Sequence, residues 1–174
     1  MSETPKYKIY SLSESAVTIE LGNSIDETTH RYVMALNEAL LQNGFEGFIE
    51  TVPAYTTATV YYNPAIIYKK IKSSPFCFVK KYIENLAEGI SLPDKSKAET
   101  ITIPVCYEDE FAPDISFIAK EKNISKEEVI GMHSSALYKV YMIGFSPGFP
   151  YMGIVNDAIA VPRKNTPRPM VEAG

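Results

Sequence analysis

The sequence predicts an α+β protein built as two domains, and three observations support this class. Short β-rich segments alternate with segments of helical periodicity through the first half of the chain. A polar stretch around Pro93 then separates that half from the second. The length of 174 residues suffices for one medium domain or two small ones. We therefore expect an α+β domain at 1–90, a linker at 91–98 and a second domain at 99–174.

The composition excludes several classes of protein. With 45% apolar and 22% charged residues, the chain has globular proportions and is neither collagen-like nor disordered. A net charge of −4 argues against a general nucleic-acid binder, which must offer a basic face to phosphates. No run approaches the roughly 18 apolar residues of a membrane span, and the polar N-terminus lacks a signal-peptide core. We expect a cytoplasmic protein that binds neither nucleic acid nor membrane.

Four strands and two helical regions are predicted in the first domain. This content favours helices on one face of an antiparallel sheet, and a ferredoxin-like order is the natural candidate. The β-rich segments, each bounded by turn residues, are Tyr7–Leu12, Ala16–Leu21, Phe48–Val52 and Thr57–Tyr62.

The two helical regions have recognisable ends. Ser24 is the expected N-cap of the first helix, because Glu27 three residues later completes a capping box. Asn43-Gly44 is a C-terminal signal. The second region, Lys69–Ala87, is expected to break near Pro75, since proline cannot continue an upstream helix. An apolar stripe marks the buried face of the first helix: Ile25, Val33, Leu36 and Leu40.

Two strands and two helices are predicted in the second domain. Pro113 suits the first turn of a short helix, and Ser125 with Glu128 makes a second capping box. The expected elements are a strand at Thr100–Tyr107, a helix from Pro113 to Lys122, a helix at Ser125–His133 and a strand at Tyr138–Phe145.

The cysteines and histidines offer few metal ligands. None of Cys77, Cys106, His30 and His133 stands at a zinc-like spacing. We predict no metal site and expect both cysteines to be buried thiols.

The segment Gly144–Gly153, GFSPGFPYMG, combines turn-forming residues with aromatic rings. Apolar rings on a stiff loop lower solubility unless they pack. One interpretation is that they fill the end of a β-barrel, and the other is that they line a ligand pocket or a partner surface. The candidate substrate- or partner-binding residues are Phe145, Pro147, Gly148, Phe149, Pro150 and Tyr151.

Two catalytic motifs are excluded in this segment. Ser146 stands in a G-x-S-x-G pattern, but Pro147 after it has no N–H to contribute to an oxyanion hole. A P-loop would require Lys-Ser/Thr after Gly153, and Ile154-Val155 follows instead. The sequence therefore gives no basis for ATP chemistry by this chain alone.

Three basic residues lie among prolines near the end of the chain. The segment is either a solvated loop paired with the acidic loop Glu108–Asp114, or an anion site for a carboxylate or phosphate. His133 is either a general base or a side chain satisfied near its helix end. The basic residues are Arg163, Lys164 and Arg168, and the candidate catalytic residues are Arg163, Arg168 and His133.

Several motifs are similar to those of one family. The most specific is the stretch Tyr138–Gly153, with Glu128–Ser134 before it and Pro162–Gly174 after it. Val52–Tyr55 and Ile103–Tyr107 add support at the start of each domain. With these motifs the chain resembles the KipI-like family, whose members are also called the 5-oxoprolinase B subunit or allophanate hydrolase subunit 1.

The resemblance implies a ferredoxin-like N-terminal domain followed by a cyclophilin-like β-barrel. It implies work in a complex with the C and A subunits of 5-oxoprolinase, which opens the lactam of 5-oxoproline to glutamate with ATP. Related domains occur in urea carboxylase. The alternative is a regulatory protein that inhibits a sporulation-type histidine kinase. Phosphorylation of the lactam oxygen would activate the amide, and we hypothesise that Arg163 and Arg168 hold the anionic charge.

The chain departs from the family pattern at three places. Glu108 and Asp109 stand where glycines are common, and Ile154 replaces a second glycine. The sequence stops at Gly174, where the family continues into further barrel strands. We therefore expect an apparently truncated barrel: either the chain is a truncated product, or another chain completes the barrel, or the given sequence omits residues. An open strand edge would invite pairing with a partner or a second copy of the chain.

Overall fold

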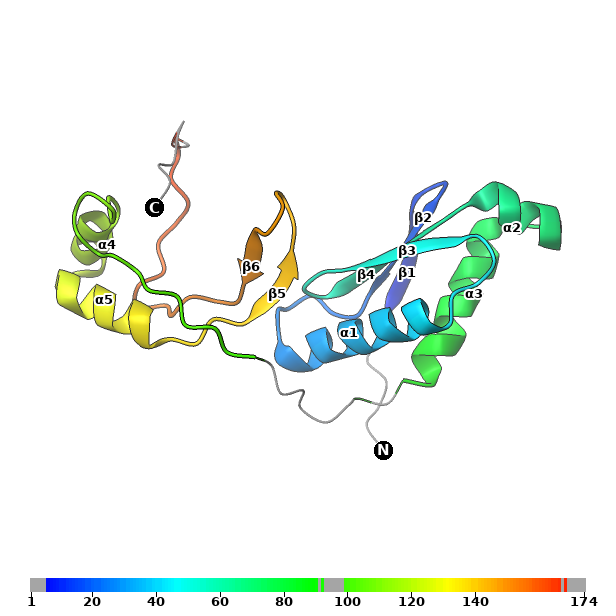
Figure 1. Ribbon diagram of the computed structural model, residues 1–174, viewed down its shortest axis with the longest axis horizontal. Coiled ribbons are helices and arrows are strands. Elements are labelled where there is room, and N and C mark those ends of the chain that lie inside the picture. Colours follow the sequence, from blue (N-terminus) through cyan, green and yellow to red (C-terminus); the bar gives the residue numbers. More distant parts are fainter. Residues whose placement is uncertain (1–5, 91, 93–98, 167, 169–174) are drawn as a thin grey trace. The chain divides into compact units, whose positions relative to one another are not determined.

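The computed structural model describes residues 6–90, 92, 99–166 and 168, and these residues form two compact units (Figure 1). The first unit comprises Met1–Lys97 and Tyr141–Tyr151, and the second comprises Ala98–Val140 and Met152–Gly174. The segment Tyr141–Tyr151 thus packs with the first unit, although it follows the expected linker. Of the expected linker at 91–98, Leu92 alone is among the described residues.

The first unit is a mixed α/β layer structure. Its sheet is antiparallel, with strand order β1-β2-β4-β3. Since β2 and β3 both pair antiparallel with β4, they run parallel to each other, with α1 as the crossover between them. The elements are β1 (Lys8–Ser13), β2 (Ala16–Glu20), α1 (Glu27–Gln42), β3 (Phe48–Pro53), β4 (Thr57–Tyr62), α2 (Pro64–Ile71) and α3 (Pro75–Glu88).

Helices cover one face of this sheet. α1 packs on β3 and β4, and α3 packs on β1 and β2 (Figure 1). Alternate strand residues share a face, so Val17 and its cross-strand partner Val60 both point into this layer. The fully buried centre of this layer consists of Val17, Ile19, Val33, Leu36, Leu40, Ala58, Val60, Val79 and Ile83. The apolar stripe predicted for α1 is thus confirmed except at Ile25, which lies before the helix and is exposed.

The start of α1 differs from the prediction. Asp26, not Ser24, is the N-cap, because its carboxylate accepts both the N–H of Thr29 at 2.8 Å and the hydroxyl of Thr29 at 2.6 Å. These hydrogen bonds hold the pKa of Asp26 below its ordinary value, and the bond from the Thr29 hydroxyl has the largest effect. The capping box expected at Ser24 was therefore wrong, since a carboxylate two residues later satisfies the free N–H groups.

The helical region after β4 breaks as predicted. Asn63 caps α2 and accepts the N–H groups of Ala65 and Ile66. Lys72, the C-cap of α2, is in the left-handed conformation, and Ser74 caps α3 ahead of Pro75. The proline thus begins a new helix at a position where its missing N–H costs nothing.

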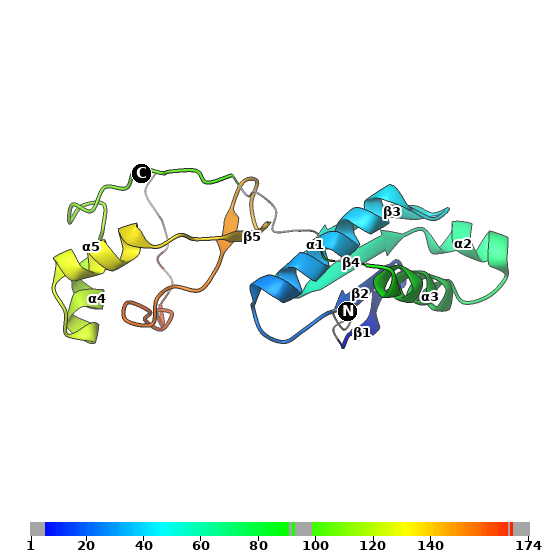
Figure 2. The same ribbon diagram turned by 90° about the horizontal axis from the view of Figure 1, so that it is seen from below.

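The second unit contains α4 (Ile115–Lys122) and α5 (Lys126–Ser135), which lie side by side (Figure 2). The predicted capping box of α5 is confirmed: Ser125 Oγ accepts the Glu128 N–H at 3.1 Å, and Glu128 Oε2 accepts the Ser125 N–H at 2.7 Å. The helices enclose a small core of Ile115, Ala119, Val129 and Ile159.

The strand expected at Thr100–Tyr107 is not formed, and this prediction was wrong. Ile101 and Ile103 are each 74% exposed, and Val105 is 54% exposed. An alternating apolar pattern gives a strand only when a neighbouring strand takes up its backbone N–H and C=O groups. The described residues provide no such neighbour for this segment and form no closed barrel.

The cysteine prediction was also wrong. Cys77 and Cys106 are both exposed free thiols. Cys77 lies in the first turn of α3, away from the core positions Val79 and Ile83, and Cys106 belongs to the exposed segment described above. Among the described residues, no helix combines the length and the apolar character needed to cross a bilayer.

Candidate functional site

A pocket of about 560 Å³ lies in the second unit. This volume is in the range of small-molecule sites, which are mainly apolar with a few polar groups. α4, α5 and the chain around Ile159 supply most of its wall. Four side chains bring polar atoms to it: Tyr107, Asp114, His133 and Arg168.

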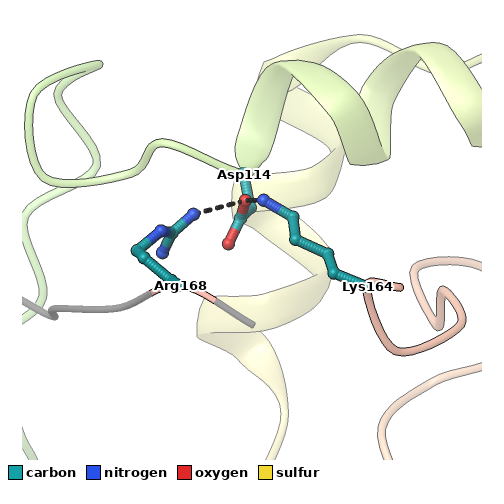
Figure 3. Close-up of polar contacts among 3 residues, drawn as sticks. All are labelled: Asp114, Lys164 and Arg168. Carbon is teal, nitrogen blue, oxygen red and sulfur yellow. Dashed lines mark hydrogen bonds and ion pairs between the residues drawn. The ribbon is translucent and has the colours of Figure 1, made fainter. Parts of the chain in front are cut away.

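Asp114 binds two cations of the basic segment (Figure 3). Lys164 Nζ and Arg168 Nη2 both donate to its Oδ1, and the arginine does so at 2.9 Å. The hydrogen bond from Lys164, with that from Arg168, holds the pKa of the Asp114 carboxyl below its ordinary value. Of the two interpretations of the basic segment, pairing with the acidic loop is observed for these two residues.

His133 forms a hydrogen bond within the pocket wall. Its Nδ1 lies 2.6 Å from the hydroxyl of Tyr107, and either atom can be the donor, depending on the tautomer. The ring of Tyr138 lies against it, with centroids 5.4 Å apart. This side chain at the last turn of α5 is therefore held in a defined orientation, with Nε2 on the other side of the ring from Tyr107.

The aromatic hairpin, defined as Tyr141–Tyr151, has an unusual turn. It contains all but the first residue of β5 (Val140–Ile143) and all but the last residue of β6 (Pro150–Met152). Phe149 N–H donates to Ser146 O at 3.0 Å around Pro147 and Gly148, whose φ of 80° is typical of a type II turn. Proline and glycine therefore stand where this turn requires them.

Phe145 has a strained backbone beside that turn. Its φ is 66°, and the N–H of Ser146 donates across it to the carbonyl of Gly144 at 2.8 Å. This is a γ-turn with positive φ, which is rare for a residue with a side chain. Phe145 is 90% exposed, and its ring lies beside that of Phe149, with centroids 5.7 Å apart. The turn thus presents an aromatic ring to solvent.

Contacts within the first unit hold the base of the aromatic hairpin. His30 Nε2 lies 2.9 Å from the carbonyl oxygen of Tyr141, and the two rings meet edge to face at 4.7 Å. Tyr55, in the turn between β3 and β4, packs against Tyr141 at 5.2 Å and Tyr151 at 6.4 Å. The hairpin is therefore fixed at its base and exposed at its tip.

The structure brings together only some of the candidate residues. His133 and Arg168 line the same pocket, whereas Arg163 is exposed and is not part of the lining. The aromatic residues of the hairpin belong to the other unit and do not line this pocket. Sequence reasoning did not single out Tyr107 or His30. No spacing rule connects Tyr107 to a histidine 26 residues away.

No metal centre is found in the part of the chain that the structure describes. Within those residues, no three side chains of His, Cys, Asp or Glu gather closely enough to hold an ion. The donors of the pocket are instead a tyrosine hydroxyl, an imidazole and charged groups. Such donors suit an organic ligand with both polar and apolar parts.

Comparisons with known proteins give relatives along nearly the whole chain. The family model described as "Carboxyltransferase domain, subdomain C and D" matches residues 7–174. The 5-oxoprolinase B subunit of Bacillus subtilis (strain 168) is 41% identical in an alignment of 174 positions, which covers 98% of this chain and 72% of that protein. The 5-oxoprolinase B subunit of Haemophilus influenzae is 32% identical, and the alignment covers 95% of this chain and 73% of that protein.

Solved structures share the fold of this chain. The crystal structure of TTHA0988 has a TM-score of 0.68 and 31% identity, over 88% of this chain but 28% of that longer chain. The urea carboxylase of Kluyveromyces lactis, at 18% identity, shares the fold with a TM-score of 0.57 over 86% of this chain and 15% of its own. The chain therefore belongs to the KipI-like family of carboxyltransferase subdomain C and D proteins.

Proposed function

We propose that this chain is a non-autonomous component of a complex that hydrolyses the lactam of 5-oxoproline to glutamate at the expense of ATP. The observation that carries the proposal is 41% identity, across 98% of the chain, to a protein named as the B subunit of a 5-oxoprolinase. The lack of a P-loop in the sequence supports a division of labour in which the C and A subunits of the family supply ATP chemistry.

The pocket of the second unit is the proposed substrate site. A lactam is a poor electrophile, so its opening requires activation and a group to hold the developing charge. Arg168 lies at the pocket with Lys164 beside it, and it would supply positive charge to the anionic carboxylate of the substrate. His133, which Tyr107 orients, would exchange a proton with the ring amide of the substrate. Arg163, which is exposed, would meet anionic groups brought by a partner protein.

The aromatic hairpin is the proposed partner-binding surface. An exposed ring on a strained backbone is the kind of feature that persists when it serves binding. Rigid aromatic anchors contribute much of the binding energy in protein interfaces. Phe145 meets both conditions, and Phe149 packs beside it. The residues assigned to this surface are Phe145, Pro147, Gly148, Phe149, Pro150 and Tyr151.

The finer fold assignments are proposals of the same kind. A split β–α–β arrangement, with β4 between β2 and β3, supports a ferredoxin-like first domain. In a ferredoxin-like sheet, the edge position beside β2 is filled by a strand that follows the second helical region. Here β1, which precedes β2 in the chain, takes that position. For the second domain, a cyclophilin-like barrel is proposed from the family resemblance, with the described residues as its first part.

Reconstitution tests the proposed function. The chain, mixed with the C and A subunits, should release glutamate from 5-oxoproline only when ATP is present. Each protein alone should be inactive. Turnover by the C and A subunits without this chain, at the rate of the full mixture, would contradict the proposal.

A matched pair of variants tests the partner surface within the same assay. Phe145→Ala should weaken assembly with the C and A subunits at least about tenfold, because exposed aromatic anchors dominate such interfaces. Leu41→Ala removes another exposed apolar side chain, 60% exposed on α1, and should leave assembly unchanged. Assembly that is equally strong with both variants would exclude the hairpin as the partner surface.

The kinase-inhibitor alternative would instead require binding to a histidine kinase without 5-oxoproline turnover.

A further inference from the structure

Asp114, Lys164 and Arg168 form a cluster of one carboxylate and two cations. Both cations bind one oxygen, Oδ1, although they lie 50 and 54 residues from Asp114 in the sequence. Figure 3 shows the two side chains approaching the carboxylate from different directions. Two converging cations form the arrangement that proteins use to bind a carboxylate or phosphate.

Asp114 pairs with the two cations and does not cap α4 with its side chain. It occupies the N-cap position of α4, where an aspartate carboxylate ordinarily accepts a free N–H of the first helical turn. Its side chain makes no such hydrogen bond, and its backbone is in the helical region rather than the extended one. The carboxylate is therefore drawn to the basic segment, away from the helix end.

The ion pairs are accessible to a competitor. The side chains are 41% exposed for Asp114, 49% for Lys164 and 38% for Arg168. Pairs this exposed contribute little to stability, since water competes with both partners. A carboxylate arriving from solution can therefore replace Asp114 without disturbing the core of the unit.

The adjoining pocket defines what else the ligand must be. Asp114 and Arg168 stand in its wall together with apolar side chains such as Phe111, Ile118 and Val155. The Tyr107–His133 pair adds neutral hydrogen-bonding groups to the same wall. A small ring with one carboxylate and one amide matches this combination of surfaces.

We propose that Asp114 occupies the ligand-carboxylate position of this site, and that a small cyclic monocarboxylate displaces it from Lys164 and Arg168. The inference rests on the proposed function, which makes 5-oxoproline the ligand. Once displaced, the Asp114 side chain can turn to the first N–H groups of α4. Asp114 thereby holds the two cations in place until the ligand binds, and the ligand carboxylate must compete with it for them.

Binding of 5-oxoproline to the full 174-residue chain, followed by calorimetry, tests this inference. Asp114→Asn removes the competing charge but can still cap α4, and it should tighten binding roughly tenfold. Arg168→Gln should weaken binding, and the gain from Asp114→Asn should disappear in the double variant. 2-Pyrrolidinone, the same ring without a carboxylate, should bind Asp114→Asn and the unaltered chain equally.

The outcomes separate this inference from the proposed function. Equal 5-oxoproline affinity of the unaltered chain and Asp114→Asn, or no binding by either, would overturn the role of Asp114. Neither result would bear on turnover by the reconstituted complex, which is measured independently. Helical circular dichroism of each variant confirms that the comparison is made between folded proteins.

Discussion

Arg168 Nη2 lies 2.9 Å from Oδ1 of Asp114, and this contact joins the basic segment to the residue that precedes α4. Lys164 binds the same oxygen. The arrangement connects a stability effect, a pH effect and a ligand site, because each depends on the charge of one carboxylate.

The first prediction concerns pH. The pKa of Asp114 is lowered from its ordinary value of 3.8, mainly by the hydrogen bond from Lys164. A depressed folded-state pKa gives stabilisation that is fully present above 3.8 and is lost as pH falls through the lower folded value. The stability difference between the unaltered chain and Asp114→Asn should stay below about 1 kcal/mol at neutral pH. Unfolding by urea at several pH values measures it, and a difference that grows on acidification would contradict the prediction.

The second prediction concerns the orientation of His133. Tyr107→Phe removes the hydroxyl that lies 2.6 Å from Nδ1 and leaves the ring of residue 107 in place. The imidazole should then populate both neutral tautomers, because one nitrogen no longer has a fixed partner. Nitrogen NMR shifts of the His133 ring report the tautomer. Identical shifts in both proteins would show that Tyr107 does not orient His133.

The third prediction separates strain from binding at Phe145. Its φ of 66° suits glycine, so Phe145→Gly should be more stable than Phe145→Ala by about 1 kcal/mol. Both variants lack the exposed ring, so both should lose partner binding to the same extent. Thermal unfolding and partner affinity, measured on the two variants side by side, test the two parts. Equal stability would indicate that the γ-turn backbone is not strained.

The fourth prediction concerns the start of α5. Ser125→Ala removes the hydroxyl that accepts the N–H of Glu128 and should destabilise the second unit by about 1 kcal/mol. Ser135→Ala, at the other end of the same helix, should change stability by less than about 0.5 kcal/mol. Amide hydrogen exchange in the first turn of α5 measures the effect locally. Unchanged protection in Ser125→Ala would exclude a role for the capping box.

Local sequence signals were enough to predict most of the first unit. Its four strands and the break before Pro75 depend on residues close together in the chain, which is why they could be identified. The same holds for the capping box at Ser125 in the second unit. Ser24 failed because two capping candidates compete within three residues, and only the geometry of the turn selects Asp26. The strand at Thr100–Tyr107 failed because strand formation depends on a distant neighbour, about which local composition carries no information.

The candidate site was less predictable than the fold. Pairing of the basic segment with the acidic loop was one of two alternatives, and the charges alone could not select Asp114 among four acidic residues. The Tyr107–His133 contact joins two elements through tertiary packing and leaves no periodic pattern. The turn at Pro147-Gly148, by contrast, follows from the residue types.

The most direct measurement is the dependence of glutamate release on 5-oxoproline concentration in the reconstituted complex carrying Arg168→Gln. We expect a rise in KM of at least about tenfold, since a charge-assisted contact to the substrate carboxylate is lost. Lys81→Gln, which removes one exposed positive charge from α3, should leave KM unchanged. Equal KM values for the unaltered and Arg168→Gln complexes would contradict the assignment of this site.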